Sequence, residues 1–361
     1  MRNVWKDIRY QLDTSSNFTD IVDSPWYDDA VYEKFSAAEY ARRHAAARRM
    51  MTDEGVDALL LTGSQNIYSM GSGVTWATGL VDDRAMCQYA VLPMDGPPTL
   101  VYPHPGCHIE AVRRMVGTDD VRDGQHGHYA HVVADRLREL GLETGRLGVT
   151  VSDRTGDEYM GVAAYHELRR QLPDLDIVFL PNLLHRLTQV KSAEELAAMR
   201  RAGQLVIDAV EAIVRTARPG MKEHQLAAAA SHAIIDGGGQ VFLLMIGSTS
   251  MDDPRIVFPN PIPSGRVLRE GDIILSEISA CHLGYSAKIG QPISIGPPTN
   301  RYDRFYKTIA VGGFDEIRSV VRAGAHLEDV QKAATYFRRH GAQSRRSSFT
   351  ASTSSPPTRT S

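Results

Sequence analysis

Hydrophobic and polar positions follow two periods along the chain, and these periods predict helices and strands in a regular order. In the first half, short apolar runs typical of buried strands alternate with stretches that have helical spacing. The first helix begins after Ser36, with Glu39 completing a capping box, and it ends at Gly55. The predicted strands here are residues 56–62, 86–93, 98–103, 146–151 and 176–181, and the later helices are residues 129–140 and 158–171. This alternation predicts a mixed α/β domain over residues 36–183.

The second half begins with a strongly periodic helix. Ser192 is a predicted N-cap with Glu195 three residues on, and a second helix is predicted to end at Gly237. The expected apolar face of the first of these helices consists of Leu196, Met199, Ala202, Val206, Ala209, Val210 and Ile213. The glycines at 237–239 follow a helix instead of opening one, so they predict a helix end and a turn instead of a phosphate-binding loop. Two further helices are expected at residues 302–324 and 327–341.

Residues 271–296 have the pattern of a β-hairpin. An apolar run at residues 273–275 predicts the first strand, Leu283-Gly284 marks the turn, and the second strand is predicted to continue to Ile295. Glu277 and Lys288 lie on opposite arms of this hairpin. They are therefore expected to share one pocket.

Three motifs in this half resemble those of the creatinase, prolidase and aminopeptidase P family, also called M24. The hairpin matches the family's metal-binding hairpin at Gly271-Asp272, Ala280 and Gly284-Tyr285. Residues 191–202 carry the pattern K-S-x-x-E-L-x-x-M-R-x-A, and residues 263–272 keep the frame P-x-x-R-x-L-x-x-G-D. The resemblance implies an α/β (α+β) protein: a creatinase-like amino-terminal α/β domain followed by a pita-bread domain at residues 184–341.

The resemblance also indicates which positions would hold the family's two metal ions. The first aspartate ligand falls on Glu277 and the second on Lys288. A cation about 4 Å from a divalent ion, at an effective dielectric constant near 20, is repelled by about 8 kcal/mol. We therefore expect a Glu277–Lys288 ion pair there, with no metal and no cofactor.

The family's remaining ligands, a histidine and two glutamates, come after residue 341 in relatives. Here residues 342–361 form a Ser-, Thr- and Pro-rich stretch that is expected to be disordered. The pita-bread domain is accordingly expected to be incomplete at its carboxy-terminal end, through truncation or a change of reading frame. An arm at residues 1–35, packed on its own chain or on a partner, precedes the first domain.

The function implied by the resemblance is hydrolysis of C–N bonds in small molecules or Xaa-Pro peptides, in a metal-independent or impaired form. Glu277 is expected to act as general base or substrate anchor, Lys288 to bind a substrate carboxylate, and Asn260 to orient the substrate. Asn260 falls where peptidases of the family have a histidine, and it cannot act as a general acid near neutral pH. The alternatives are a non-catalytic pita-bread binding protein and an inactive truncated fragment, in which the Glu277–Lys288 pair is structural.

Substrate-binding roles are expected for His104, His108 and Tyr285. The two histidines flank Cys107, and a second group comprises His126, His128 and His131. Spacings of two to four residues are compatible with zinc, although such groups are more often solvated surface residues. The same histidines are candidates for reaching a cleft formed with the second domain or a second subunit.

Composition restricts the partners and the compartment. The 361-residue chain has a net charge of −3, which gives no electrostatic case for binding nucleic acid or a membrane. Its three widely spaced cysteines fit a reducing cytoplasm better than a disulfide framework. The expected partners are a small-molecule or short-peptide substrate and, by resemblance, a second copy of the chain in a homodimer.

Overall fold

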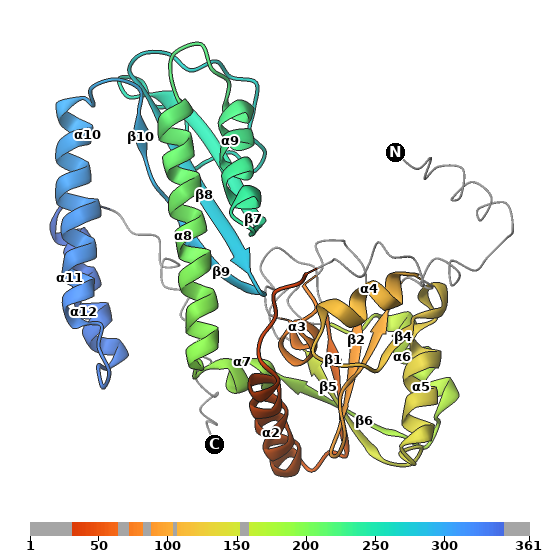
Figure 1. Cartoon of the computed structure of the whole chain (residues 1–361). Helices are drawn as coiled ribbons and strands as arrows, with labels where there is room; N and C mark the ends of the chain where they lie inside the picture. The colour runs from red at the N-terminus through yellow and green to blue at the C-terminus, as the bar shows by residue number, and fades with distance from the viewer. Residues whose placement is uncertain (1–30, 64–71, 82–87, 104–106, 152–158, 343–361) are drawn as a thin grey trace, which may run out of the picture. The chain divides into compact units, whose positions relative to one another are not determined.

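The structure of the protein is a computed structural model that describes residues 31–63, 72–81, 88–103, 107–151 and 159–342 (Figure 1). The predicted tail and most of the predicted amino-terminal arm lie outside these residues. The chain divides into two compact units. One comprises the residues up to Arg215 with 227–245 and 277–290, and the other comprises 216–226, 246–276 and the residues from 291 onward. The expected domain boundaries after residues 35, 183 and 341 stay a prediction.

The amino-terminal part of the first unit is built on a six-stranded mixed sheet in the order β4-β3-β2-β1-β5-β6. The strands are β1 (Ala58–Thr62), β2 (Tyr89–Pro93), β3 (Thr99–Tyr102), β4 (Val121–Asp123), β5 (Arg146–Val151) and β6 (Asp176–Pro181). β1 pairs with β2 in antiparallel and with β5 in parallel orientation, and β5 pairs with β6 in parallel orientation. The five strands expected from the sequence are confirmed, and β4 is an additional short edge strand.

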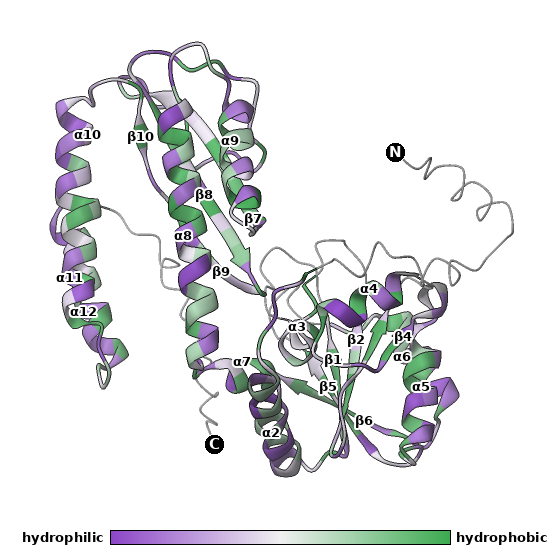
Figure 2. Ribbon diagram, in the orientation of Figure 1, coloured by the Kyte–Doolittle hydropathy of each residue, from purple (hydrophilic) through white to green (hydrophobic). Residues whose placement is uncertain are grey.

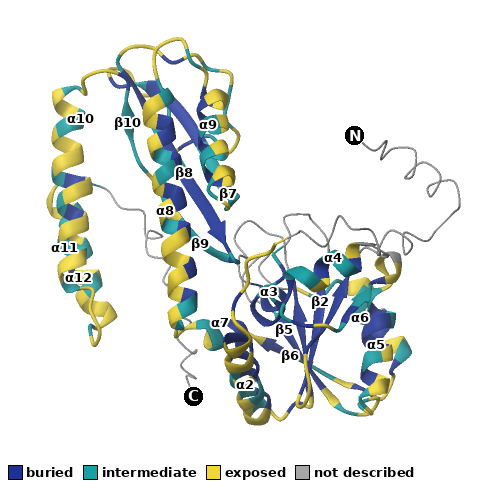
Figure 3. Ribbon diagram, viewed as in Figure 1, coloured by how far each residue is buried: buried dark blue, intermediate teal, exposed yellow. Residues whose placement is uncertain are grey.

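Helices cover both faces of this sheet, as the alternation of elements predicts. They are α2 (Ala37–Glu54), α3 (Gly73–Thr78), α4 (Cys107–Met115), the short 3₁₀ turn η3 (Gln125–Gly127), α5 (Tyr129–Glu139), α6 (Val162–Gln171) and α7 (Leu183–Thr188). One core cluster joins apolar side chains of α2, α3, α4 and α7 to one face, and another joins α5 and α6 to the opposite face. Because both faces are covered, β1, β2 and β3 are buried along their whole length (Figure 3). In Figure 2 the middle parts of β1 and β2 have the green of hydrophobic residues.

The two predicted capping boxes have different outcomes. Helix α8 (Ala193–Thr216) begins with the full box, since the Ser192 hydroxyl accepts from Glu195 N–H while Glu195 accepts from Ser192 N–H. At α2 the Ser36 hydroxyl accepts from the N–H of Glu39, but the Ser36 N–H donates to Glu194 at 2.9 Å. The predicted hydrogen bond from the Ser36 N–H to the Glu39 carboxylate is therefore wrong. The carboxylate of Glu194, from a distant segment, accepts from the Ser36 N–H instead.

The apolar face of α8 differs from the predicted one at its amino-terminal end. Leu196 and Met199 are 39% and 37% exposed, whereas Glu195 is buried. The face turned to the protein interior there consists of Ala198, Ala202, Leu205, Val206, Ala209, Ala212 and Ile213. Helix α9 (Glu223–Asp236) follows, and the turn at residues 237–239 confirms the predicted helix end.

The predicted hairpin is present in a second, smaller sheet of order β10-β8-β7, with β9 also paired to β8. Its strands are β7 (Gln240–Ser250), β8 (Asp272–His282), β9 (Tyr285–Ile289) and β10 (Ile293–Ser294). The second hairpin strand is shorter than predicted, because β9 ends at Ile289 and β10 pairs separately with the start of β8.

The turn of this hairpin contains two residues with positive φ, Leu283 at 51° and Gly284 at 79°. Two left-handed residues in succession are typical of the type I′ turn, whose twist suits a two-residue hairpin. Leucine rarely adopts this conformation, but the side chain of Leu283 packs against the cluster of Phe35, Tyr40 and Ala198. Burial of an apolar side chain therefore offsets the backbone cost at this position.

The carboxy-terminal part of the described chain is helical, as predicted. Helix α10 (Asn300–Phe305) continues through the π-helical turn η4 (Tyr306–Val311) into α11 (Gly312–Val320), and α12 (Leu327–Arg339) follows after a short connection. α11 and α12 pack on each other, where Gly312 and Gly313 leave room for the rings of Tyr336 and Phe337. Within the described ranges, no helix is both long enough and apolar enough to cross a membrane.

Candidate functional site

The hairpin formed by β8 and β9 brings Glu277 and Lys288 together. Lys288 lies directly opposite Ser279, so Glu277, two residues before Ser279, lies on the same face of the hairpin as a diagonal neighbour. The Lys288 ammonium nitrogen is 2.5 Å from Oε1 of Glu277. The predicted ion pair is therefore confirmed, while the catalytic roles assigned to the two residues stay predictions.

The exposure of this pair determines what it can do. The Lys288 side chain is 53% exposed and the Glu277 side chain is 19% exposed. An exposed ion pair of this kind contributes about 0–1 kcal/mol to stability, because water screens the attraction. Water therefore reaches the Lys288 ammonium, whereas most of the Glu277 side chain is shielded from it.

The resemblance implies divalent metal ions, and the donor set of this chain can be tested against them. Lys288 places a positive charge within hydrogen-bonding distance of the one carboxylate that stands at a ligand position of the family pattern. Within the described segments, no group of three or more His, Cys, Asp or Glu side chains is arranged to hold a metal ion. The residues of the hairpin therefore do not fit the family's metal centre.

Asn260, the third predicted catalytic residue, lies in the second unit within a loop that is fastened by a buried carboxylate. Glu223, at the start of α9, is fully buried. It accepts hydrogen bonds from the backbone N–H and the hydroxyl of Ser248, both at 2.7 Å, and from the N–H and hydroxyl of Ser264 at 3.0 and 2.5 Å. The side-chain nitrogen of Asn260 donates to the same carboxylate at 3.2 Å.

The charge state of Glu223 follows from these bonds. Burial acts to raise the pKa of its carboxyl, but the hydrogen bonds from Ser264 and Ser248 outweigh burial and hold the pKa below its ordinary value. Arg266 strengthens the arrangement, since its guanidinium donates to the Ser248 hydroxyl and to both oxygens of Asp272. Glu223 is therefore an ionised acceptor at neutral pH, and the loop that carries Asn260 is held from several sides.

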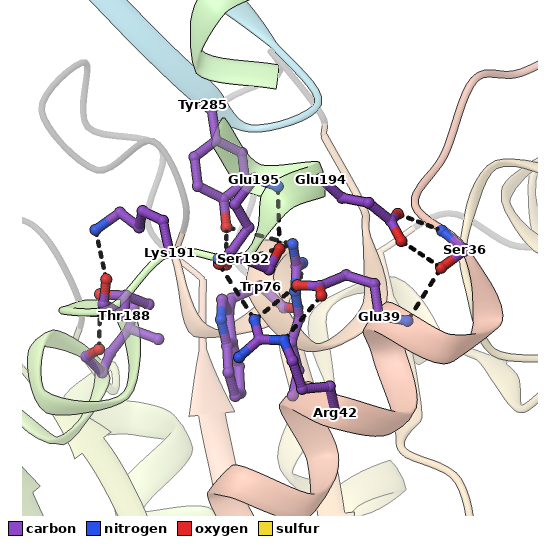
Figure 4. Close-up of polar contacts among 12 residues, drawn as sticks. Ser36, Glu39, Arg42, Trp76, Thr188, Lys191, Ser192, Glu194, Glu195 and Tyr285 are labelled. Carbon is purple, nitrogen blue, oxygen red and sulfur yellow. Dashed lines mark hydrogen bonds and ion pairs between the residues drawn. The ribbon is translucent and has the colours of Figure 1, made fainter. Parts of the chain in front are cut away.

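Tyr285 lies within a buried cluster of charges and rings (Figure 4). Its hydroxyl donates to Glu195 at 2.5 Å, and the Arg43 guanidinium donates to the hydroxyl at 3.3 Å. Burial raises the pKa of the Tyr285 hydroxyl, which stays protonated although Arg43 opposes this shift. Glu195 and Arg43, the two hydrogen-bonding partners of Tyr285, belong to the first unit, as Tyr285 does. The role of Tyr285 in substrate binding stays a prediction.

Arg43 is the centre of this cluster. Its side chain is 1% exposed, donates to Glu39 at 2.7 Å and to the Trp76 carbonyl at 2.9 Å, and lies 3.5 Å from Glu195. The guanidinium carbon stands 4.2 Å from the centre of the Phe35 ring. The cluster thus connects α2 and the start of α8 to the tip of the hairpin (Figure 4).

The histidines expected to bind substrate are placed only in part. His104 lies outside the described residues, and His108 is an exposed residue in the first turn of α4. In the second group, Nε2 of His131 lies 2.6 Å from Glu167, and the rings of His128 and His131 are 5.6 Å apart. The substrate-binding roles of His104 and His108 stay predictions.

Two important groups were missed in the sequence, Glu223 and the pair formed by Arg43 with Glu195. Glu223 is an acid in the first turn of a helix, a position that usually only complements the helix dipole. Its serine partners are 25 and 41 residues away along the chain. No local sequence pattern indicates such distant contacts. The available sequence signal for a buried Glu223 is that an acid stands in a helix with an apolar, inward-facing side.

Comparison with known proteins gives similarities along most of the chain. Residues 197–353 match the model of metallopeptidase family M24. The uncharacterized hydrolase/peptidase y4tM of Sinorhizobium fredii is 24% identical over 320 residues, and the probable dipeptidase PepE of Mycobacterium tuberculosis is 27% identical over 311 residues. Each match covers 83% of this chain and 76% of the relative.

A solved structure, the Xaa-Pro dipeptidase from Bacillus anthracis, is similar with a TM-score of 0.65. The match covers 84% of this chain and 78% of that chain, at 17% sequence identity. At this identity the likeness concerns the fold alone, and it confirms the predicted α/β class and pita-bread fold.

Proposed function

We propose that this chain, whose residues 197–353 match the model of metallopeptidase family M24, hydrolyses C–N bonds in short peptides or small molecules without a bound metal ion. The observation that carries the proposal is the ammonium of Lys288, 2.5 Å from Glu277 at the position where the family pattern has a second acidic ligand. The names of the relatives, peptidase, dipeptidase and hydrolase, favour an enzyme over a non-catalytic binding protein.

In this proposal the exposed ion pair opens when substrate binds. A substrate carboxylate takes the place of Glu277 beside Lys288, and the released Glu277 carboxylate accepts a proton from the attacking water. The hydroxide adds to the carbonyl carbon, the C–N bond breaks, and Glu277 returns the proton to the leaving nitrogen. A role of Asn260, which lies in the other unit, stays a separate prediction. For a peptide the products are a carboxylate and an amine, whereas for creatine the hydroxide adds to the guanidino carbon and the products are urea and sarcosine.

The test uses the full chain after chelation, with metal content measured by elemental analysis. Hydrolysis of Ala-Pro and of creatine is followed by release of proline and of sarcosine, with and without added Mn²⁺ or Co²⁺. We expect turnover of at least one substrate that is insensitive to chelation. We also expect its loss, by about 100-fold or more, in Glu277→Gln, where the general base is removed.

A matched control separates a specific role of Lys288 from the loss of any surface charge. Lys307 forms a comparable exposed pair with Asp303, 2.7 Å apart. Lys288→Met is expected to raise KM, whereas Lys307→Met leaves KM and kcat unchanged. Activity that depends strictly on added metal, or equal behaviour of the two lysine variants, would contradict the proposal.

A further inference from the structure

The amide of Asn260 has a defined orientation because its neighbour is a carboxylate. An ionised carboxylate can only accept hydrogen bonds, so the group that faces Glu223 must be the NH₂ of the Asn260 amide and not its oxygen. Four other hydrogen bonds from two serines hold the Glu223 carboxylate in place. The side chain of Asn260 cannot reverse without placing two oxygens against each other.

The strand beneath the loop supports the same orientation. A Cβ atom at Gly247 would lie 3.2 Å from Nδ2 of Asn260 and 2.9 Å from its backbone nitrogen. The absence of a side chain at Gly247 therefore lets the loop approach β7 with the amide nitrogen on the strand side. The amide nitrogen is thus the atom that contacts Glu223, and Oδ1 is the other polar atom of the amide.

Oδ1 of Asn260 remains available to a ligand. Among the residues that the structure describes, no hydrogen bond to this oxygen is found, and the side chain is only partly buried. Three side chains of the same loop, Val257, Phe258 and Ile262, are apolar and 97%, 57% and 81% exposed. The loop thus offers a hydrogen-bond acceptor flanked by apolar surface.

We propose that Asn260 accepts a hydrogen bond from an N–H group of the substrate through Oδ1, and that Glu223 is the residue that positions it. The preferred substrates are then secondary amides or guanidino compounds with an apolar neighbouring group. A tertiary Xaa-Pro amide, which has no N–H group, is the poorer ligand. This inference rests on the proposed function, because it names the class of substrate that the proposed hydrolase would bind.

The experiment measures binding by calorimetry with two probes that differ in one N–H group, L-leucyl-glycine and L-leucyl-sarcosine. Wild-type protein is expected to bind L-leucyl-glycine about three- to tenfold more tightly, the effect of one hydrogen bond. In Asn260→Ala the two affinities are expected to agree within about twofold. A histidine can donate to Glu223 with one ring nitrogen and accept with the other, so Asn260→His is expected to keep the preference.

The exposed asparagine at the start of α10 provides the matched control, since Asn300→Ala is expected to keep the wild-type preference. A merely structural role of Asn260 would change both affinities equally and leave their ratio unaltered. Equal affinities in the wild type, no binding of either probe, or an unchanged ratio in Asn260→Ala would each overturn the inference. A retained preference without hydrolysis of L-leucyl-glycine, Ala-Pro or creatine would instead overturn the proposed function alone.

Discussion

Replacement of Arg43 by methionine tests whether the buried cluster of Figure 4 holds the hairpin tip in place. Methionine fills most of the volume of the arginine but has no charge and no donor. The change leaves the carboxylates of Glu39 and Glu195, both buried, with one cation instead of two, because among the described residues Arg42 is the remaining cation that contacts them. The carbonyl of Trp76 also loses the donor that it has now.

The expected cost can be worked out from these contacts. Removal of one partner from a buried ion pair destabilises a protein by about 3–5 kcal/mol. The remaining contacts with Arg42 favour the lower end of this range. The lost stacking of the guanidinium on Phe35 adds about 1 kcal/mol. We therefore expect Arg43→Met to lower the free energy of unfolding of this unit by about 4 kcal/mol.

Arg42 provides a control on the same helix. It contacts the same two carboxylates, Glu39 at 2.7 Å and Glu195 at 3.2 Å, but its side chain is 42% exposed. Solvent screening limits the value of such a pair, so Arg42→Met is expected to cost about 1 kcal/mol or less. Both variants remove one arginine from the same two acids, so the comparison tests the burial of Arg43 together with its contacts to Trp76 and Phe35.

Urea unfolding followed by tryptophan fluorescence measures both effects. The chain has three tryptophans, Trp5, Trp26 and Trp76, and Trp76 is buried in α3 next to the cluster. A background in which Trp5 and Trp26 are phenylalanine makes the signal specific to this unit. If Arg43→Met and Arg42→Met cost the same within about 0.5 kcal/mol, burial of Arg43 does not stabilise the unit and the reasoning fails.

Three further results are expected. Gly284→Ala should destabilise the hairpin by about 1–2 kcal/mol in urea unfolding, because φ is 79° and the new Cβ would lie 2.5 Å from Thr75. Gly247→Ala should cost about 1–3 kcal/mol and alter the amide NMR signals of the loop, since its Cβ would lie 2.9 Å from the nitrogen of Asn260. The pKa of Glu39 is lowered from 4.5 to about 2, because its bonds to two arginines outweigh burial. The contribution of Glu39 to the free energy of unfolding is therefore complete above about pH 5 and is lost as the pH falls toward 2. Urea titrations at several pH values should show that Glu39→Gln lacks this part of the wild-type pH dependence.

The elements that could be predicted from the sequence are those whose partners are near in the chain. Glu277 and Lys288 are 11 residues apart on a hairpin, so the alternation of a strand and a turn was sufficient to pair them. Strand periods likewise predicted five of the six strands of the first sheet, and β4 was missed because its three residues are too few for a period. Local geometry determines all of these features.

Features that depend on distant residues could not be predicted. Ser36 takes its second capping bond from Glu194, 158 residues away, and Arg43 contacts Tyr285 across 242 residues. Each of these polar groups also has a satisfactory local interpretation as a cap or a solvated charge. The pattern of charges along one helix does not distinguish a buried arginine from an exposed one, and Arg42 and Arg43 differ only in the direction in which they point.

Two side chains of the hairpin's second strand, Tyr285 and Lys288, differ in how firmly their surroundings hold them. At the tip, Tyr285 is tied to Glu195 and Arg43, whose side chains are each 1% exposed, so rearrangement there would leave charges unpaired away from water. Three residues along the arm, Lys288 is 53% exposed, so water screens its attraction to Glu277. A binding group works best when its backbone is fixed and its own bond is easily exchanged. The buried cluster is therefore the support that would let an exposed lysine act at a defined place, and loss of Arg43 should weaken substrate binding by Lys288 although the two side chains have no common partner.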